Sequence, residues 1–299
     1  ILLFYYKRLQ IRLLKYYHNF ILKKINQTIE GCLHKPILID VTYKETTSPK
    51  HVIIFSHGFK GFKDWGSFNK IAEYFALNDF VFVKFNFSYN GTTPDFPLDF
   101  TDLSAFGNNN FCKELDDLKL VIDWVYNNKF LENEIDIDNI SLFGHSRGGG
   151  ISIINASDNR INKIVSWASP SNLLRKLPSG NKLKLWQKTN VAYVYNGRTK
   201  QNMPMYFQFY KNCIDNKDRL SIKQSLRKIN KPHLIVHGSE DSTVLLNDAL
   251  EMKSWGKKTK LYIIDSANHV FDSFHPYDLD VFPADLKEAL DVTISFLKG

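Results

Sequence analysis

Short apolar runs alternate with amphipathic, helix-like segments along most of the chain from residue 31 onward. The runs are rich in Val, Ile and Phe, which is typical of strands buried on both faces of a sheet. Strands are predicted at 36–43, 51–57, 80–87, 139–145, 161–169, 232–238 and 259–265, and helices at 68–78, 113–129 and 284–297. This alternation predicts an α/β fold, with a mostly parallel sheet and helices on both faces.

Residues 170–231 interrupt the alternation. Asn196 and Gly197 stand there between two strand-like runs, and both tolerate the positive φ of a type I′ turn, so a β-hairpin is predicted. About sixty residues without secondary structure are uncommon inside a domain. We therefore expect a small inserted cap that contains the hairpin and lies over the strand ends. An elaborated surface loop is the alternative.

The first part of the chain follows a helical period instead. One side of a helical wheel carries Arg8, Arg12, Lys15, Asn19, Lys23 and Asn26. The charges recur too often for a membrane-spanning helix, and the pattern does not match a secretory signal. We expect a basic amphipathic extension over 1–30, ahead of one domain over 31–299. Three interpretations of the extension stay open: contact with an anionic membrane surface, docking on the domain, or residues foreign to the natural chain.

The composition, 43% hydrophobic and 23% charged residues in a chain of 299, is that of a globular protein. The net charge is +8, but residues 1–30 hold six basic residues against Glu30 alone. The remaining excess is too small to indicate a nucleic-acid groove. The cysteines, Cys32, Cys112 and Cys213, lie far apart and form neither a CxxC pair nor a metal-binding spacing. We expect a reducing, cytoplasmic location without disulfides.

One serine stands on a sharp corner, in the sequence Gly144-His145-Ser146-Arg147-Gly148. G-x-S-x-G is frequent by chance, but here it follows a buried-type strand and precedes a predicted helix, which is the setting of a nucleophile elbow. A serine hydroxyl becomes a strong nucleophile only when a base accepts its proton. We therefore predict Ser146 as a nucleophile that needs a histidine and an acid elsewhere. An ordinary turn serine is the alternative.

The base and the acid are predicted from strand ends. His269 follows the last predicted strand, and Asp241 follows the strand before it. The carboxyl ends of parallel strands meet at one edge of a sheet, so both side chains are expected near Ser146. The order Ser, Asp, His along the chain is also that of hydrolases with this corner motif. Glu240 and His275 remain as rivals to Asp241 and His269.

Two backbone N–H groups are expected to stabilise an oxyanion. Arg147 begins the helix after the serine, where the helix dipole favours negative charge. Phe59 lies in the loop "SHGFKGF" at 56–62, where Gly58 and Gly61 let the backbone approach closely.

Together these motifs resemble an α/β-hydrolase from about residue 36 to residue 297. The loop "HGFKG", the segment "FNFSYNGTT" and the inserted hairpin are most similar to the branch of dienelactone-hydrolase-like proteins, cinnamoyl and feruloyl esterases and related serine peptidases. Dienelactone hydrolases proper have a cysteine where this chain has Ser146. The Arg-Gly-x-Gly that is common after the fourth strand position is replaced here by "SYNGTT".

The resemblance implies hydrolysis of a small-molecule carboxylic ester through an acyl-enzyme, with no metal or organic cofactor. A serine peptidase and a non-catalytic binding protein on the same fold are the alternatives, and the oligomeric state stays open. His57 and His237 are expected to be structural. The group Asp272, His275, Asp278 and Asp280 is expected to be a polar loop. The aromatic residues of the cap are expected to be either core residues or pocket lining: Trp186, Tyr193, Tyr195, Tyr206, Phe207 and Phe209. The basic residues of the cap are expected to form a solvated face: Lys182, Lys184, Lys188, Arg198 and Lys200.

Overall fold

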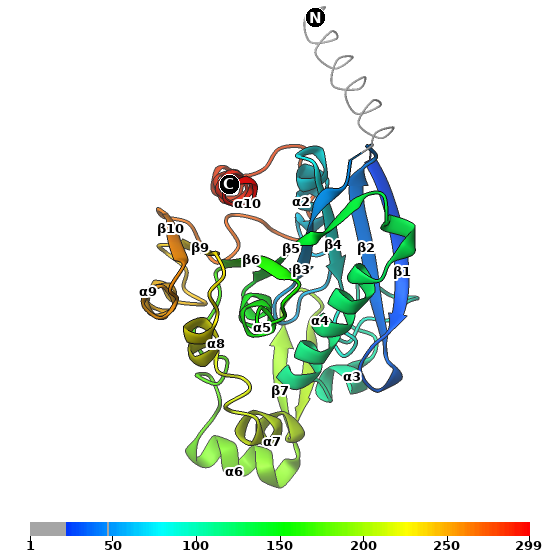
Figure 1. Cartoon of the computed structure of the whole chain (residues 1–299). Helices are drawn as coiled ribbons and strands as arrows, with labels where there is room; N and C mark the ends of the chain where they lie inside the picture. Colours follow the sequence, from blue (N-terminus) through cyan, green and yellow to red (C-terminus); the bar gives the residue numbers. More distant parts are fainter. Residues whose placement is uncertain (1–21, 47) are drawn as a thin grey trace, which may run out of the picture.

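The computed structural model describes residues 22–46 and 48–299 (Figure 1). Eight strands form one sheet in the order β1-β2-β4-β3-β5-β6-β9-β10. Their bounds are β1 Leu22–Glu30, β2 Pro36–Lys44, β3 Lys50–Ser56, β4 Phe80–Phe85, β5 Ile135–His145, β6 Ile161–Trp167, β9 His233–Gly238 and β10 Thr259–Ile264. Within this sheet, as far as the described residues go, only the pairs β1–β2 and β2–β4 are antiparallel, so the predicted mostly parallel sheet is confirmed.

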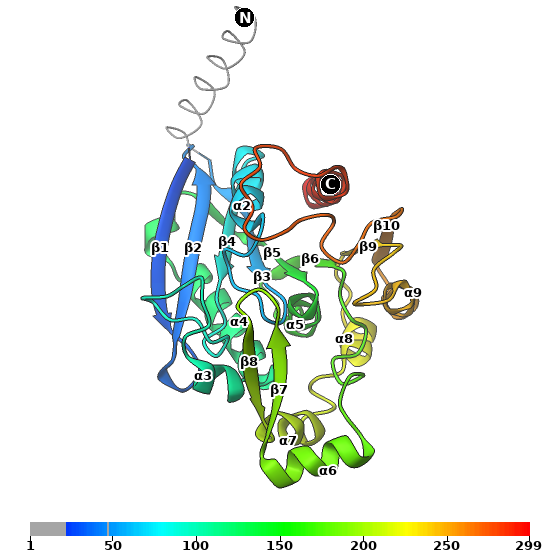
Figure 2. The same cartoon turned by 180° about the vertical axis from the view of Figure 1, so that it is seen from behind.

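Helices cover both faces of this sheet (Figures 1 and 2). Alternate residues of β3 enter two separate cores, because side chains along a strand point to opposite faces. Val52 and Ile54 pack in the core that contains α4 and α5, whereas Ile53 and Phe55 pack in the core that contains α2 and α10. The helices are α2 Phe68–Leu77, α3 Leu103–Gly107, α4 Phe111–Tyr126, α5 Arg147–Asn155, α6 Gly180–Thr189, α7 Gln208–Asp215, α8 Ile222–Lys228, α9 Leu246–Trp255 and α10 Ala284–Lys298, with short 3-10 turns at Cys32–His34 and Lys129–Leu131.

The amphipathic helix expected over residues 1–30 is wrong for residues 22–30, which form the edge strand β1. β1 pairs with β2 along its whole length, from Leu22 opposite Lys44 to Glu30 opposite Pro36. Ile25 packs against the core. The pairing satisfies backbone groups at the outer edge of β2, so the sheet begins before residue 31. Residues 1–21, which carry most of the expected helix, lie outside the described residues. Within the described part, no helix is both long and apolar enough to cross a membrane.

The segment between β6 and β9 contains α6, α7, α8 and the predicted hairpin, which consists of β7 (Val191–Asn196) and β8 (Gln201–Tyr206). The predicted two-residue type I′ turn is wrong. Asn196 pairs with Gln201, which leaves residues 197–200 as the loop, and Lys200 takes the left-handed conformation (φ 54°). Asn196 instead stabilises the loop with its side chain, whose Oδ1 accepts a hydrogen bond from the N–H of Arg198 (3.2 Å).

Candidate active site

Ser146 occupies a strained corner between β5 and α5. Its φ of 56° and ψ of −125° lie outside the regions that residues with a side chain normally adopt. A Cβ on Gly148 would lie 2.1 Å from the carbonyl oxygen of Ser56, and one on Gly144 would lie 2.2 Å from the carbonyl oxygen of Gly148. Only glycine fits at these two positions, so the motif allows strand and helix to meet tightly enough to project the serine.

The structure brings Ser146, His269 and Asp241 together, although they are far apart in the sequence. Ser146 Oγ lies 3.0 Å from Nε2 of His269, and Nδ1 of His269 lies 2.7 Å from Oδ2 of Asp241. β5, β9 and β10 belong to the parallel part of the sheet, so the residues at or just after their ends emerge at the same edge. This is the arrangement of a nucleophile, a base and an acid that orients the base.

Asp241 is held in place by its own turn. Its Oδ1 accepts hydrogen bonds from the N–H groups of Thr243 (2.8 Å) and Val244 (2.9 Å), which leaves Oδ2 for His269. Burial raises the pKa of Asp241, but the hydrogen bond and charge of His269 together with the two N–H groups outweigh it, so the pKa lies below its ordinary value. The carboxylate is therefore ionised at neutral pH.

Neither rival residue takes part. Glu240 is exposed to solvent, whereas the neighbouring Asp241 side chain is fully buried. Nδ1 of His275 accepts a hydrogen bond from the N–H of Gly66 (2.8 Å), and its ring stacks on Trp65. His275 therefore stabilises the loop before α2.

Two other histidines have structural partners. Nδ1 of His57 donates to the carbonyl oxygen of Gly58 (2.8 Å), and Nε2 of His237 donates to the carbonyl oxygen of Val244 (2.8 Å). Burial lowers the pKa of His57 to about 4, so its ring is neutral at pH 7. The expected structural roles of His57 and His237 are confirmed.

His145, the variable residue of the elbow, also supports the site. Its Nε2 donates to the carbonyl oxygen of His269 (2.9 Å), which ties the loop after β10 to the end of β5. Burial, assisted by the neighbouring His269, lowers the pKa of His145 to about 3. The ring therefore acts as a neutral hydrogen-bond donor.

The loop that carries Phe59 packs directly on the nucleophile. A Cβ on Gly58 would lie 3.1 Å from Cβ of Ser146. The side chain of Asn90, in the loop after β4, donates to the carbonyl oxygen of Gly61 (3.4 Å). This hydrogen bond ties the loop after β4 to the loop that carries Phe59. The Arg147 guanidinium lies 4.1 Å from the centre of the Phe59 ring and adds a cation–π contact. Both residues predicted as oxyanion donors thus lie beside Ser146.

A cavity of about 240 Å³ opens at Ser146. It is lined by Gly58, Phe59, Lys60, Gly61, Trp65, Phe68, His145, Ser146, Asn196, Arg198, His269 and Val270. The hairpin therefore contributes to the cavity through Asn196 and Arg198. Arg198, one of the basic cap residues expected to form a solvated face, is exposed and also lines this cavity. The position of Arg198 depends on where the folded hairpin lies, and the local sequence does not predict that location.

The cap aromatics divide into core and surface residues. Trp186, Phe207 and Phe209 are buried in the core, whereas Tyr193 and Tyr195 are 64% and 58% exposed. In the described structure none of the six cap aromatics lines the cavity at Ser146, whose aromatic wall is formed by residues before β4. Elsewhere, no group of three or more His, Cys, Asp or Glu residues within 22–46 and 48–299 is arranged to hold a metal ion.

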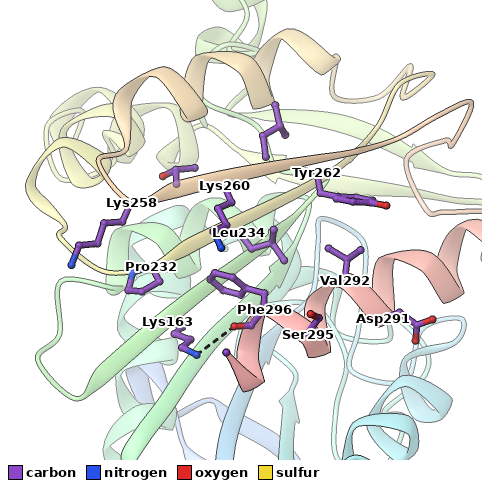
Figure 3. A pocket seen from close by; sticks show the side chains of 13 residues that line it. Lys163, Pro232, Leu234, Lys258, Lys260, Tyr262, Asp291, Val292, Ser295 and Phe296 are labelled. Atoms are coloured by element: carbon purple, nitrogen blue, oxygen red, sulfur yellow. Dashed lines mark hydrogen bonds between the residues drawn. The ribbon is translucent and has the colours of Figure 1, made fainter.

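A larger groove of about 960 Å³ lies between the β9–β10 edge and α10 (Figure 3). Leu234 and Phe296 contribute apolar lining, and Lys163 Nζ donates to the carbonyl oxygens of Phe296 (3.3 Å) and Leu297 (2.8 Å) at the end of α10. Ser146, Asp241 and His269 are not among its lining residues, so it is separate from the site at the serine.

No family model and no curated protein matches the chain. Solved structures do resemble it. Est1E from Butyrivibrio proteoclasticus with bound ferulic acid is 16% identical, with a TM-score of 0.69, covering 91% of this chain and 98% of that one. EstE1, a thermostable carboxylesterase from a metagenomic library, is 19% identical, with a TM-score of 0.64 and coverages of 93% and 89%. Dienelactone hydrolase from Anabaena variabilis is 12% identical, with a TM-score of 0.61 and coverages of 93% and 97%. The predicted α/β-hydrolase fold is confirmed.

Proposed function

We propose that this protein is a serine hydrolase that cleaves carboxylic esters through an acyl-enzyme intermediate. The observation that carries the proposal is His269, whose two ring nitrogens lie within hydrogen-bonding distance of Ser146 and Asp241. Two structural neighbours support the same chemistry: EstE1, a carboxylesterase, and Est1E, which binds ferulic acid.

In the first half of the reaction, Ser146 Oγ attacks the ester carbonyl carbon while Nε2 of His269 takes the hydroxyl proton. Asp241 fixes the ring so that Nδ1 carries the other proton, and its charge stabilises the imidazolium. The tetrahedral intermediate then expels the alcohol, which receives the proton from Nε2. An acyl group remains on Ser146.

In the second half, Nε2 of His269 takes a proton from water as the water oxygen attacks the acyl carbon. The second tetrahedral intermediate then expels Ser146 Oγ, which receives that proton from Nε2, and the acid is released. The negative oxygen formed in each half is stabilised by the N–H groups of Phe59 and Arg147. One such donor contributes about 3 kcal/mol in comparable sites. All proton transfers use this chain's own residues.

Ester hydrolysis is favoured over aminopeptidase activity by the cavity itself. Its charged lining side chains in the described structure are Lys60 and Arg198, apart from the ionisable histidines. A free substrate amino group needs a carboxylate partner, and like charges repel it.

The proposal is tested with short-chain p-nitrophenyl esters, methyl ferulate and aminoacyl p-nitroanilides. We expect kcat/KM for the best ester to exceed that for every anilide, and Ser146→Ala to lower it by at least about 10⁴-fold. Equal ester hydrolysis by the Ser146→Ala variant would contradict a serine mechanism. Faster hydrolysis of the anilides would support a peptidase instead.

A further inference from the structure

Two cationic residues from segments far apart in the sequence, Lys60 and Arg198, line the cavity at Ser146. Lys60 lies in the loop between β3 and α2, next to Phe59, and Arg198 lies in the turn of the hairpin. No carboxylate of the described residues lines the same cavity. The other residues that line it are aromatic, small or neutral polar residues and the histidines of the site, His145 and His269.

Arg198 is fixed in place by contacts that leave its charge largely uncompensated. Its guanidinium lies 5.1 Å and 5.6 Å from the ring centres of Phe62 and Phe100, and Nη2 donates to the carbonyl oxygen of Leu98 (3.1 Å). Its acidic neighbour is Asp99, at 3.5 Å, whose side chain is 62% exposed. Such a long, solvated ion pair is weak. A guanidinium has five N–H donors, so several remain for a ligand.

Lys60 is held by a contact with the hairpin. Its Nζ donates to the carbonyl oxygen of Tyr195 in β7 (3.1 Å), and this hydrogen-bond partner is a neutral group. Its backbone is left-handed (φ 56°), which is unfavourable for a lysine and is typical of residues positioned at functional sites. Lys60 and Arg198 therefore give the lining of this cavity two positive charges.

We propose that the cavity binds small esters that carry a carboxylate in their acyl or alcohol part, with Arg198 and Lys60 as the residues that recognise it. This inference rests on the proposed ester hydrolysis and names its substrate class. The guanidinium fork matches the two oxygens of a carboxylate, and the ammonium supplies a point charge. The cavity volume of about 240 Å³ lies below the roughly 300–1,000 Å³ of most ligand sites, which favours a small substrate.

Two matched substrate pairs test the proposal. The first pair places the charge in the acyl part: the p-nitrophenyl half-ester of glutaric acid against p-nitrophenyl valerate. The second pair places it in the alcohol part: 4-acetoxybenzoate against its methyl ester. We expect the charged member of at least one pair to have a KM about 10-fold or more below that of the neutral member. This preference should weaken as salt increases, because salt screens charge attraction.

Variants assign the preference to named residues. Arg198→Gln and Lys60→Gln should each raise KM for the preferred charged ester about 10-fold, with less than about 3-fold change for its neutral partner. Asp99→Asn removes the competing carboxylate, so it should lower KM for the charged ester. Lys184→Gln is the matched control, because it removes one positive charge from exposed α6 and should change neither KM. Equal KM changes for the charged and neutral esters in Arg198→Gln would overturn the role of Arg198.

The failure of this proposal can be told apart from the failure of the proposed function. If the neutral esters are hydrolysed by Ser146 as well as the charged ones in both pairs, the carboxylate specificity is wrong and the serine hydrolase stands. If no ester is hydrolysed and no covalent label attaches to Ser146, the proposed function itself is wrong, and the specificity fails with it.

Discussion

Nδ1 of His269 lies 2.7 Å from Oδ2 of Asp241, a carboxylate that is completely buried. Asp241→Asn keeps the size of the side chain but offers His269 an amide, which favours the wrong tautomer of the ring. We expect kcat for the best ester to fall about 10⁴-fold. The N–H groups of Thr243 and Val244 still find an acceptor oxygen, so circular dichroism should show a folded protein.

Glu240→Gln is the control for that variant. Glu240 is the adjacent acid in the sequence, but it is exposed. We expect its kcat to stay within about 2-fold of wild type, as for most surface changes away from a site. A loss in Glu240→Gln comparable with that in Asp241→Asn would overturn the assignment of the acid.

The glycine behind the elbow should tolerate no side chain. In Gly148→Ala the new Cβ would lie 2.1 Å from the carbonyl oxygen of Ser56, so backbone must move. We expect a loss of at least about 3 kcal/mol in the free energy of unfolding, measured by urea denaturation. Gly197→Ala is the matched control, because a Cβ there meets no atom within 4 Å. It should change stability by less than about 0.5 kcal/mol. Similar losses in both variants would contradict the tight packing at the elbow.

A buried ionic cluster supports the early part of the sheet. Nζ of Lys84 in β4 lies 2.6 Å from Oδ2 of Asp40 and also contacts Asp64, and Lys84 is almost inaccessible to solvent. Lys63 contacts the same two carboxylates. Lys84→Ala leaves the largely buried carboxylates of Asp40 and Asp64 with one ammonium, so we expect a loss of about 3 kcal/mol in the free energy of unfolding.

The exposed pair in α10 provides the comparison. Lys287 contacts Asp291 one helical turn away, and both side chains are about half exposed. Lys287→Ala should cost no more than about 0.5 kcal/mol in the same measurement, since solvent screens exposed pairs. If Lys84→Ala cost as little, the cluster around Asp40 would not stabilise the fold.

Asp117 makes stability depend on pH. It is fully buried and accepts hydrogen bonds from the N–H of Cys32 (3.0 Å) and from Ser88, and burial raises its pKa to about 6. A raised pKa means that the folded state holds the proton more tightly. The stabilisation from this proton is therefore complete below about pH 4 and disappears as the pH rises through 6.

Asp117→Asn cannot titrate and isolates this contribution. The free energy of unfolding of wild type minus that of the variant should fall by about 3 kcal/mol between pH 4 and pH 7. Urea denaturation at five or six pH values in this range measures the difference. A difference that stays constant with pH would show that Asp117 does not change its protonation there.

The sequence predicts the strands of the parallel sheet because their apolar runs are long and almost unbroken. It does not predict β1. Ile25 and Ile29 are four residues apart, and that spacing puts them on one side of a helix and also on one face of a strand. These residues form a strand and not a helix because they pair with the outer edge of β2, which is a separate segment of the chain.

The candidate site likewise contains residues that the sequence predicts and residues that it does not predict. Ser146, Asp241 and His269 follow strand ends, so the sheet alone brings them to one edge, and a local motif marks the serine. Arg198 and Asn196 reach the cavity only because the hairpin folds back over it. A hairpin can be predicted from sequence, but the surface on which it lies depends on contacts between distant residues, such as that of Lys60 with Tyr195.

The proposed reaction depends on activation of the Ser146 hydroxyl by His269. The most direct measurement is mass spectrometry of the intact protein and its peptides after treatment with a fluorophosphonate, which reacts covalently with activated serines. We expect one adduct per chain, located on Ser146, absent in Ser146→Ala and formed far more slowly in His269→Ala. No adduct on the wild-type protein, or an adduct on another residue that persists in Ser146→Ala, would contradict the account.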